Sequence, residues 1–489
     1  MHSHTPARRV ALILGPLVGL TVIALARAGI GLGTLEPPAF AMLGVTFWVA
    51  LWWVTECLPV GATSLLPVLL LPLSGVMTSG QTAGSYMDRF ILLMMAGFMA
   101  ALAIEKWGLH RRMSLVVILR VGTSPRRLVL GMMVATAFVS MWIANTAATL
   151  IMLPIGLALV SRLESDIPDK AVFAKFSAAL CLSIAYGASI GGMGTPIGTP
   201  PNLIYMGAVE KHFGSAPGFL EWMGIAVPIC VMLIAFVYLY FVYKVGLPDS
   251  IPGAGRDVLL AEKAALGPMS PEEKRVAIVF VTMVVLWITR QIDLDSGHSI
   301  GWAPFLGLDK TIDDATVAVL GVIVLFTWPS PRHAGERLLD WDTARRIPWE
   351  VVLLFGGGLA LAKGFEASGL SAAITGGLSQ LEGLPTLVVI LTVVLCVTFL
   401  SEVTSNTAIT TLLMPILAPF AKAADLPPET VMLPAALAAS CGFMLPVATP
   451  PNAIVYGSGR VPIALMARTG FWLDIAGVFI VGLWVWLVT

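Results

Sequence analysis

The chain has 489 residues, of which 57% are hydrophobic and 12% are charged, and its mean hydropathy is +0.89. A soluble domain carries about 25% charged residues, and this chain cannot supply the charged coat that a water-soluble globule of its size needs. Its 29 basic and 29 acidic residues balance, so no basic excess favours nucleic acid. These figures exclude a soluble enzyme, a nucleic-acid binder and a disordered protein, and they predict an all-helical, polytopic membrane protein.

Apolar runs follow one another along the whole chain, and a spanning helix needs about 20 mostly apolar residues. The runs cover 10–28, 39–56, 58–76, 88–106, 128–161, 174–207, 222–246, 276–292, 313–329, 350–369, 386–421, 430–457 and 470–488. The runs 128–161 and 386–421 are about twice as long as one span and are interrupted by polar residues at 143–146 and 402–407. Irregular backbone at that depth must be buried in protein or line a cavity. We therefore predict two re-entrant helical hairpins and eleven transmembrane helices.

The basic residues support this count, because Lys and Arg accumulate in cytoplasmic loops. With the N-terminus in the cytoplasm, the predicted cytoplasmic segments contain the basic clusters at 8–9, 106–127, 162–175, 244–275, 332–346 and 460–468. The outer loops carry isolated cations only. The predicted location is the inner (cytoplasmic) membrane, with the C-terminus outside.

An internal repeat relates the two halves of the chain. At an offset of 261 residues, Asn145-Thr146-Ala147 matches Asn406-Thr407-Ala408, and at an offset of 250, 199–202 matches 449–452, both Thr-Pro-Pro-Asn. Five crossings separate the equivalent elements, so the repeats are predicted to be inverted, which is typical of secondary transporters. The predicted organisation is a first segment and helix at 1–38, one repeat at 39–246 with hairpin 128–161, a cytoplasmic linker at 247–275, and a second repeat at 276–489 with hairpin 386–421.

The two hairpin tips and the two Thr-Pro-Pro-Asn segments carry the candidate site. A Pro-Pro pair prevents a continuous helix and frees backbone carbonyls upstream, and these join Asn and hydroxyl oxygens in a neutral cage of the kind that holds Na⁺ in broken-helix transporters. The same breaks begin new helices, whose N-terminal N–H groups attract a carboxylate. No Lys or Arg lies within the four motifs. Two such half-sites suit a substrate with two anionic ends.

Other polar residues give weaker signals. Glu402 lies beside the second tip, where the equivalent residue of the first half is Met141, and it is a candidate to cap or orient that tip. Glu56, Glu105, Glu366 and Asp474 lie near predicted span ends, where solvated roles are expected. The six histidines fall in polar or inter-helix segments, and the five cysteines lack ligand spacing. An intramembrane enzyme would need a nucleophile–base pair or a metal cluster, and no His or Cys is placed to form one. We therefore predict neither an enzyme nor an organic cofactor.

The motifs 141–146, 152–154 and 401–407, with both Thr-Pro-Pro-Asn segments, resemble those of the divalent anion/sodium symporter family, the sodium–dicarboxylate cotransporters. The resemblance covers nearly the whole chain after the first helix. It implies a homodimer in which a scaffold domain holds a transport domain that moves in an elevator fashion. It also implies C4-dicarboxylates such as succinate, malate or fumarate, citrate, or sulfate as substrates.

The resemblance also assigns residues. One Na⁺ site would use Ser140, Ala144 (backbone only), Asn145 and Gly198, and the other would use Ser401, Thr404, Asn406 and Ala448. Substrate contacts would come from Asn145, Thr146, Thr199, Ser405, Asn406, Thr407, Thr449 and Pro450. The family's first motif begins with Ser where this chain has Ala144, so one hydroxyl is missing.

The predicted function is therefore import of a small divalent anion coupled to Na⁺, by a transporter embedded in the lipid bilayer. Two readings within this class stay open: a Na⁺-independent dicarboxylate exchanger, which the missing hydroxyl at Ala144 favours, and a sulfate transporter of the same fold. A passive channel is the alternative from another class. The residues do not distinguish the anion, the Na⁺ stoichiometry or the direction of transport.

Overall fold

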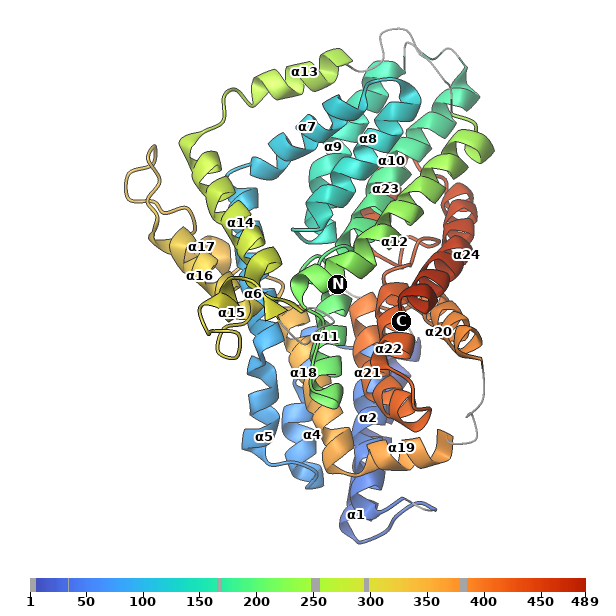
Figure 1. Cartoon of the computed structure of the whole chain (residues 1–489). Coiled ribbons are helices and arrows are strands. Elements are labelled where there is room, and N and C mark those ends of the chain that lie inside the picture. Colours follow the sequence, from blue (N-terminus) through green and yellow to red (C-terminus); the bar gives the residue numbers. More distant parts are fainter. Residues whose placement is uncertain are drawn as a thin grey trace.

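The structure, a computed structural model, describes residues 6–33, 35–164, 167, 169–247, 256–293, 299–378 and 385–489, and these are almost entirely helical (Figure 1). The exception is a two-stranded antiparallel ribbon of β1 (Ile292–Asp293) and β2 (Ser299–Ile300). The prediction of an all-helical protein is confirmed. The linker predicted at 247–275 holds the helix α13, and residues 248–255 of it lie outside the described residues.

The elements of the first half follow one another closely. They are α1 (Pro6–Arg27), α2 (Pro37–Thr55), α3 (Val60–Thr63), α4 (Leu66–Ser74), α5 (Ser79–Ala83), the 3₁₀ turn η1 (Gly84–Met87), α6 (Arg89–Lys106), α7 (Leu109–Val121), α8 (Pro125–Ser140), α9 (Asn145–Leu163), α10 (Lys170–Met193), α11 (Pro200–Phe213), α12 (Phe219–Tyr240) and the π-helical turn η2 (Phe241–Val245).

The second half repeats much of this order. Its helices are α13 (Arg256–Ala265), α14 (Pro271–Arg290), α15 (Trp302–Phe305), α16 (Asp314–Thr327), α17 (Trp341–Ala344), α18 (Trp349–Ala367), α19 (Leu370–Leu378), α20 (Thr386–Ser401), α21 (Asn406–Ala423), α22 (Pro428–Ala439), α23 (Pro450–Gly457) and α24 (Ile463–Val488).

Several helices are long and apolar enough to cross a membrane, which makes this a multi-pass membrane protein. Among the described residues seven qualify by length and composition, namely 6–27, 37–55, 79–106, 145–163, 170–193, 219–245 and 463–488. Shorter apolar helices at 60–74, 314–327 and 386–401 accompany them. The predicted number of eleven crossings is a finer statement than this, and it stays a prediction.

The chain breaks where the sequence predicts interruptions. The long runs become the pairs α8–α9, α10–α11, α20–α21 and α22–α23. The sequence did not predict one further break. The run 58–76 divides into α3 and α4 at Ser64–Leu65. The N–H of Val68 donates to the carbonyl of Leu65 instead of that of Ser64, and the carbonyl of Ser64 accepts a hydrogen bond from the Tyr86 hydroxyl at 2.5 Å.

The first hairpin packs on α10 through glycines, and α8, α9 and α10 lie together at one end of the molecule in Figure 1. A Cβ on Gly187 would lie 2.6 Å from the carbonyl oxygen of Met133, and one on Gly191 would lie 2.2 Å from that of Ala137. The backbones of α8 and α10 therefore approach so closely that only glycine fits at these two positions of α10.

Ion pairs also join the ends of neighbouring helices. Arg112 of α7 binds both carboxylate oxygens of Glu273 of α14, at 3.0 and 3.2 Å. Lys106, which ends α6, lies 2.6 Å from Asp340 in the connection before α17. The hydrogen bond from Lys106 lowers the pKa of Asp340 to about 2.

Two of the histidines in polar segments are buried, which the sequence pattern did not indicate. His212 lies in the last turn of α11, and His110 lies in α7. Both rings can be buried because Nδ1 of each has a polar partner. Nδ1 of His110 lies 3.2 Å from the carbonyl oxygen of Ile104, and Nδ1 of His212 lies 2.6 Å from Glu366.

We expect Gly191→Ala to destabilise the protein by at least about 1–3 kcal/mol, the cost of overpacking a tight core, because the added methyl collides with backbone of α8. Thermal unfolding in detergent measures this. Gly224 of α12 is the matched control, since a Cβ there meets no atom within 4 Å. An equal melting temperature for Gly191→Ala and Gly224→Ala would contradict the close approach of α8 and α10.

Candidate functional site

The predicted contacts for an anion occupy the first positions of four helices. Asn145 and Thr146 begin α9, Asn406 and Thr407 begin α21, and Pro450 begins α23. The N-cap residues contribute the other three, namely Thr199, Ser405 and Thr449. The first N–H groups of a helix have no intrahelical acceptor, so α9 and α21, which begin without proline, place backbone donors at their tips. Helices α11 and α23 begin with Pro-Pro, which has no N–H, and the next N–H groups of Asn202 and Asn452 are taken by Thr199 and Thr449.

The first hairpin tip gathers several oxygen atoms around one hydroxyl hydrogen. Ser140 Oγ lies 2.7 Å from Asn145 Oδ1 and 2.8 Å from the carbonyl oxygen of Ala188. A serine hydroxyl has a single hydrogen to donate, so it can be given to only one of these two oxygens. The carbonyl of Ala144 begins α9 by accepting from the N–H of Ala148 at 3.0 Å.

The broken segment between α10 and α11 lies against this tip. A Cβ on Gly192 would lie 2.4 Å from Asn145 Oδ1, and one on Gly198 would lie 2.5 Å from the carbonyl oxygen of Gly192. Asn202 then holds the break, because its Nδ2 donates to the carbonyls of Thr195 at 2.7 Å and Gly192 at 3.0 Å. Asn145 and Gly198 are thus brought together around Gly192.

The second half repeats this pattern at the equivalent positions. Asn452 Nδ2 donates to the carbonyls of Leu445 at 3.0 Å and Gly442 at 3.3 Å. A Cβ on Gly442 would lie 3.2 Å from Ala448 Cβ and 3.5 Å from Ser401 Oγ. The offset of 250 residues that matches the motifs therefore also matches the hydrogen bonds, and it brings together Ser401 and Ala448.

The side chains of the second predicted Na⁺ set differ in their hydrogen bonding. The hydroxyl of Thr404 donates to the carbonyl of Leu400 at 2.7 Å, and that of Ser401 donates to Thr398 at 2.8 Å. The buried Asn406 Oδ1 has no hydrogen-bond partner within the described part of the chain. An uncompensated buried amide oxygen is costly, so Asn406 is the residue of this tip that a bound cation would satisfy.

The two halves interlock around these sites. Helix α11 of the first half packs against α21 and α22 of the second, and α23 of the second half packs against α9 and α10 of the first. Each of these two helices therefore packs against the other half of the chain.

The turn beside the hairpin tip is held by different groups in the two halves, and the sequence predicted a role only for Glu402. Glu402 accepts from the backbone N–H groups of Met444 at 2.9 Å and Leu445 at 3.0 Å, so the predicted orienting role fits the structure. In the first half Met141 stands at that position, and its carbonyl accepts a hydrogen bond from the Thr195 hydroxyl. A hydroxyl-to-carbonyl bond in one half thus replaces a carboxylate in the other.

Asp474 was expected near a span end with a solvated role, and that expectation is wrong. Its side chain is fully buried in α24 against Glu402. Small neighbours admit it, since Gly470 and Gly477 of the same helix face Phe443 and Cys441. The glycines one turn before and three residues after Asp474 were a signal for this close packing.

A family model and several known proteins match this chain. The model described as "Sodium:sulfate symporter transmembrane region" matches residues 8–489. The sodium-dependent dicarboxylate transporter SdcS of Staphylococcus saprophyticus is 40% identical over 485 residues, which are 98% of this chain and 91% of that protein. The protein of the same name from Staphylococcus aureus strain MW2 is also 40% identical, with the same coverage.

Two solved transporters share the fold at low sequence identity. The YdaH transporter of Alcanivorax borkumensis has a TM-score of 0.58 at 15% identity, and 99% of each chain is covered. MtrF of Neisseria gonorrhoeae, described as one of a class of antimetabolite efflux pumps, has a TM-score of 0.61 at 13% identity, with 98% and 95% covered.

We expect Glu402→Gln to loosen the segment 443–445, because an amide offers one acceptor oxygen where the carboxylate offers two. A hydrogen bond to a charged group contributes about 1.5–3 kcal/mol, so amide exchange of this segment should accelerate by at least tenfold. Hydrogen-exchange mass spectrometry measures it, with Met141→Leu as the control. Unchanged exchange at 443–445 in Glu402→Gln would show that the carboxylate does not hold the turn.

Proposed function

Because the chain belongs to the sodium:sulfate symporter family, we propose that it is a secondary active transporter that moves a small divalent anion across the membrane together with Na⁺. Its relatives and structural neighbours are transporters rather than enzymes. We propose a C4-dicarboxylate such as succinate, malate or fumarate as the substrate, or citrate, with sulfate as the alternative anion. The names of the relatives favour a dicarboxylate.

One observation carries this proposal: four helices begin at the polar motifs, and the hydrogen bonds of the two halves match. Each helix N-terminus presents a partial positive charge to an anion, and α9 and α21, which begin without proline, can also present N–H donors. Asn202 and Asn452 fix the broken segments that precede two of these N-termini with equivalent bonds. Two equivalent electropositive half-sites suit an anion with one carboxylate at each end.

The proposed Na⁺ ligands are the neutral oxygens beside these N-termini. One set comprises Ser140, Ala144, Asn145 and Gly198, and the other comprises Ser401, Thr404, Asn406 and Ala448. The oxygens crowded around Ser140 and the unsatisfied Asn406 Oδ1 support these sets. Ala144 offers only its carbonyl, so the first set has fewer ligands than a serine would give, and Na⁺-independent exchange is the second candidate function.

The finer architecture belongs to the same proposal. We propose eleven crossings with two re-entrant hairpins, inverted repeats, and a homodimer in which the part that holds the site moves as an elevator in the inner membrane. The cytoplasmic N-terminus and outer C-terminus follow from the basic loops. The division of the chain into repeats at 39–246 and 276–489 is supported by the matching pairs α6–α7 and α18–α19.

We expect proteoliposomes with an inward Na⁺ gradient and no internal substrate to accumulate labelled succinate above its external concentration. Replacement of Na⁺ by choline should abolish this accumulation, because the driving force is the Na⁺ gradient. Parallel assays with citrate and sulfate identify the preferred anion. Uptake that ignores Na⁺ and requires internal dicarboxylate would instead establish the exchanger, and equilibration without accumulation would establish a channel.

We expect Asn145→Ala and Asn406→Ala each to reduce uptake by at least a hundredfold while the protein stays folded, because each removes an amide that both the cation and the anion need. Uptake and thermal stability are measured on the same preparation. Thr392→Ala is the control, since that hydroxyl on the hairpin arm α20 only meets the carbonyl of Val388. Normal transport by both asparagine variants would refute the site.

A further inference from the structure

The last turn of α11, the helix whose first turn carries Pro200-Pro201-Asn202, is fastened to two neighbouring helices by three consecutive side chains. Glu210 forms an ion pair with Arg89 of α6. Lys211 Nζ lies 3.4 Å from the carbonyl of Leu359 of α18, and His212 lies 2.6 Å from Glu366 of the same helix. One end of α11 therefore bears half of the proposed site, and the other end is docked on α6 and α18.

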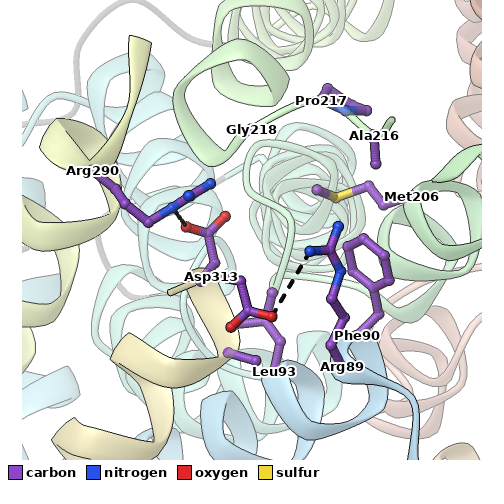
Figure 2. Close-up of a pocket in the computed structure, with 11 residues that line it drawn as sticks. Arg89, Phe90, Leu93, Met206, Ala216, Pro217, Gly218, Arg290 and Asp313 are labelled. Atoms are coloured by element: carbon purple, nitrogen blue, oxygen red, sulfur yellow. Dashed lines mark hydrogen bonds and ion pairs between the residues drawn. The ribbon is translucent and has the colours of Figure 1, made fainter. Parts of the chain in front are cut away.

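Arg89 lies at the edge of a small open cavity of about 50 Å³. Figure 2 shows Arg89 and Arg290 approaching this cavity from different helices, each with a carboxylate against its guanidinium. Asp313 lies 3.9 Å from Arg89, and Asp314 lies 2.6 Å from Arg290. The two acids at the start of α16 would therefore keep both guanidinium groups paired if Glu210 moved away.

The internal repeat assigns an equivalent to the ion pair, with the charges exchanged. The offset of 261 residues that relates α6 to α18 takes Arg89 to Glu350, and the offset of 250 that relates α11 to α23 takes Glu210 to Arg460. Both equivalents lie in the described part of the chain, and neither forms an ion pair there. Glu350 is exposed at the start of α18, and Arg460 lies in the turn after α23.

Inverted repeats explain alternating access when each half can adopt the arrangement of the other. This structure has only one of the two equivalent ion pairs. On the basis of the transport function proposed above, we propose that Arg89–Glu210 and Glu350–Arg460 are alternative locks: the first fastens the conformation described here, and the second forms in the opposite conformation when the first opens.

The solvation of the groups suits a lock that opens. The side chains of Arg89 and Glu210 are 46% and 29% exposed, and an ion pair that water can reach is weak and easily exchanged. A buried pair would instead leave two unpaired charges in a dry interior on each cycle, at a large cost. Each conformation would contain one of the two ion pairs, so neither conformation would be stabilised strongly over the other.

Cross-linking in proteoliposomes tests this proposal without relying on transport. The background carries Cys396→Ser, which removes the exposed cysteine. Arg89→Cys with Glu210→Cys, and separately Glu350→Cys with Arg460→Cys, are treated with a bismaleimide of about 8–10 Å span, and cross-linked peptides are quantified by mass spectrometry. We expect both pairs to cross-link, and in the variant with all four cysteines we expect each molecule to contain one cross-link but never both.

Charge variants supply the second arm. Glu210→Gln should raise the yield of the Glu350→Cys/Arg460→Cys cross-link at least threefold, because it weakens the competing lock. Arg345→Gln is the matched control, since it disrupts an exposed pair with Asp342 that lies on neither lock. No cross-link between positions 350 and 460 under any Na⁺ or succinate condition would overturn the proposal, as would both cross-links in one molecule.

These outcomes are separate from those of the transport proposal. Loss of the locks with intact Na⁺-driven uptake would overturn only the lock, and two exclusive cross-links in a protein that does not accumulate any anion would overturn only the coupled transport.

Discussion

Broken helices inside an apolar protein leave backbone groups that must find partners, and this constraint governs the structure. Carbonyls freed between α10 and α11 or between α22 and α23 cannot rely on bulk water. Asn202 and Asn452 solve the problem with one amide nitrogen each, which donates to carbonyls of the segment that precedes its own helix. The carbonyls are satisfied in this way, and the Pro-Pro pairs at the start of the next helices add no N–H groups that need a partner.

The two halves hold the turn beside each hairpin tip with different chemical groups. In the second half, Glu402 accepts two backbone N–H groups, and that solution places a carboxylate beside the buried Asp474. In the first half, Thr195 and the backbone of Met141 make the link without a charge. Trp142 then stacks on Phe219 at 6.4 Å between ring centroids, so aromatic packing anchors that tip. One tip is therefore fastened by charge and the other by packing.

The sequence predicted the positions of the interruptions well. Asn145 and Asn406 begin helices, and both Thr-Pro-Pro segments precede one, because proline and polar tips act locally on the backbone. It failed where a side chain's surroundings come from distant elements. The burial of Asp474 depends on glycines facing the α22–α23 connection, and that of His212 depends on Glu366 of another helix. The hydropathy of a single segment cannot reveal either of these contacts with distant elements.

The absence of lysine and arginine from the four motifs gives the proposed coupling a physical basis. A helix N-terminus contributes about half an elementary charge at most, so the two negative charges of the proposed anion are better offset when cations are bound beside it. Asn145 and Asn406 belong to both the proposed cation sites and the proposed anion site. A primary amide has an oxygen that accepts and a nitrogen that donates. A cation on Oδ1 of either residue would therefore polarise the amide and strengthen its N–H bonds to a carboxylate, while the bound anion would favour the cation in return. In a neutral site each ligand supplies the charge that the other lacks, so simultaneous occupation is favoured over either alone.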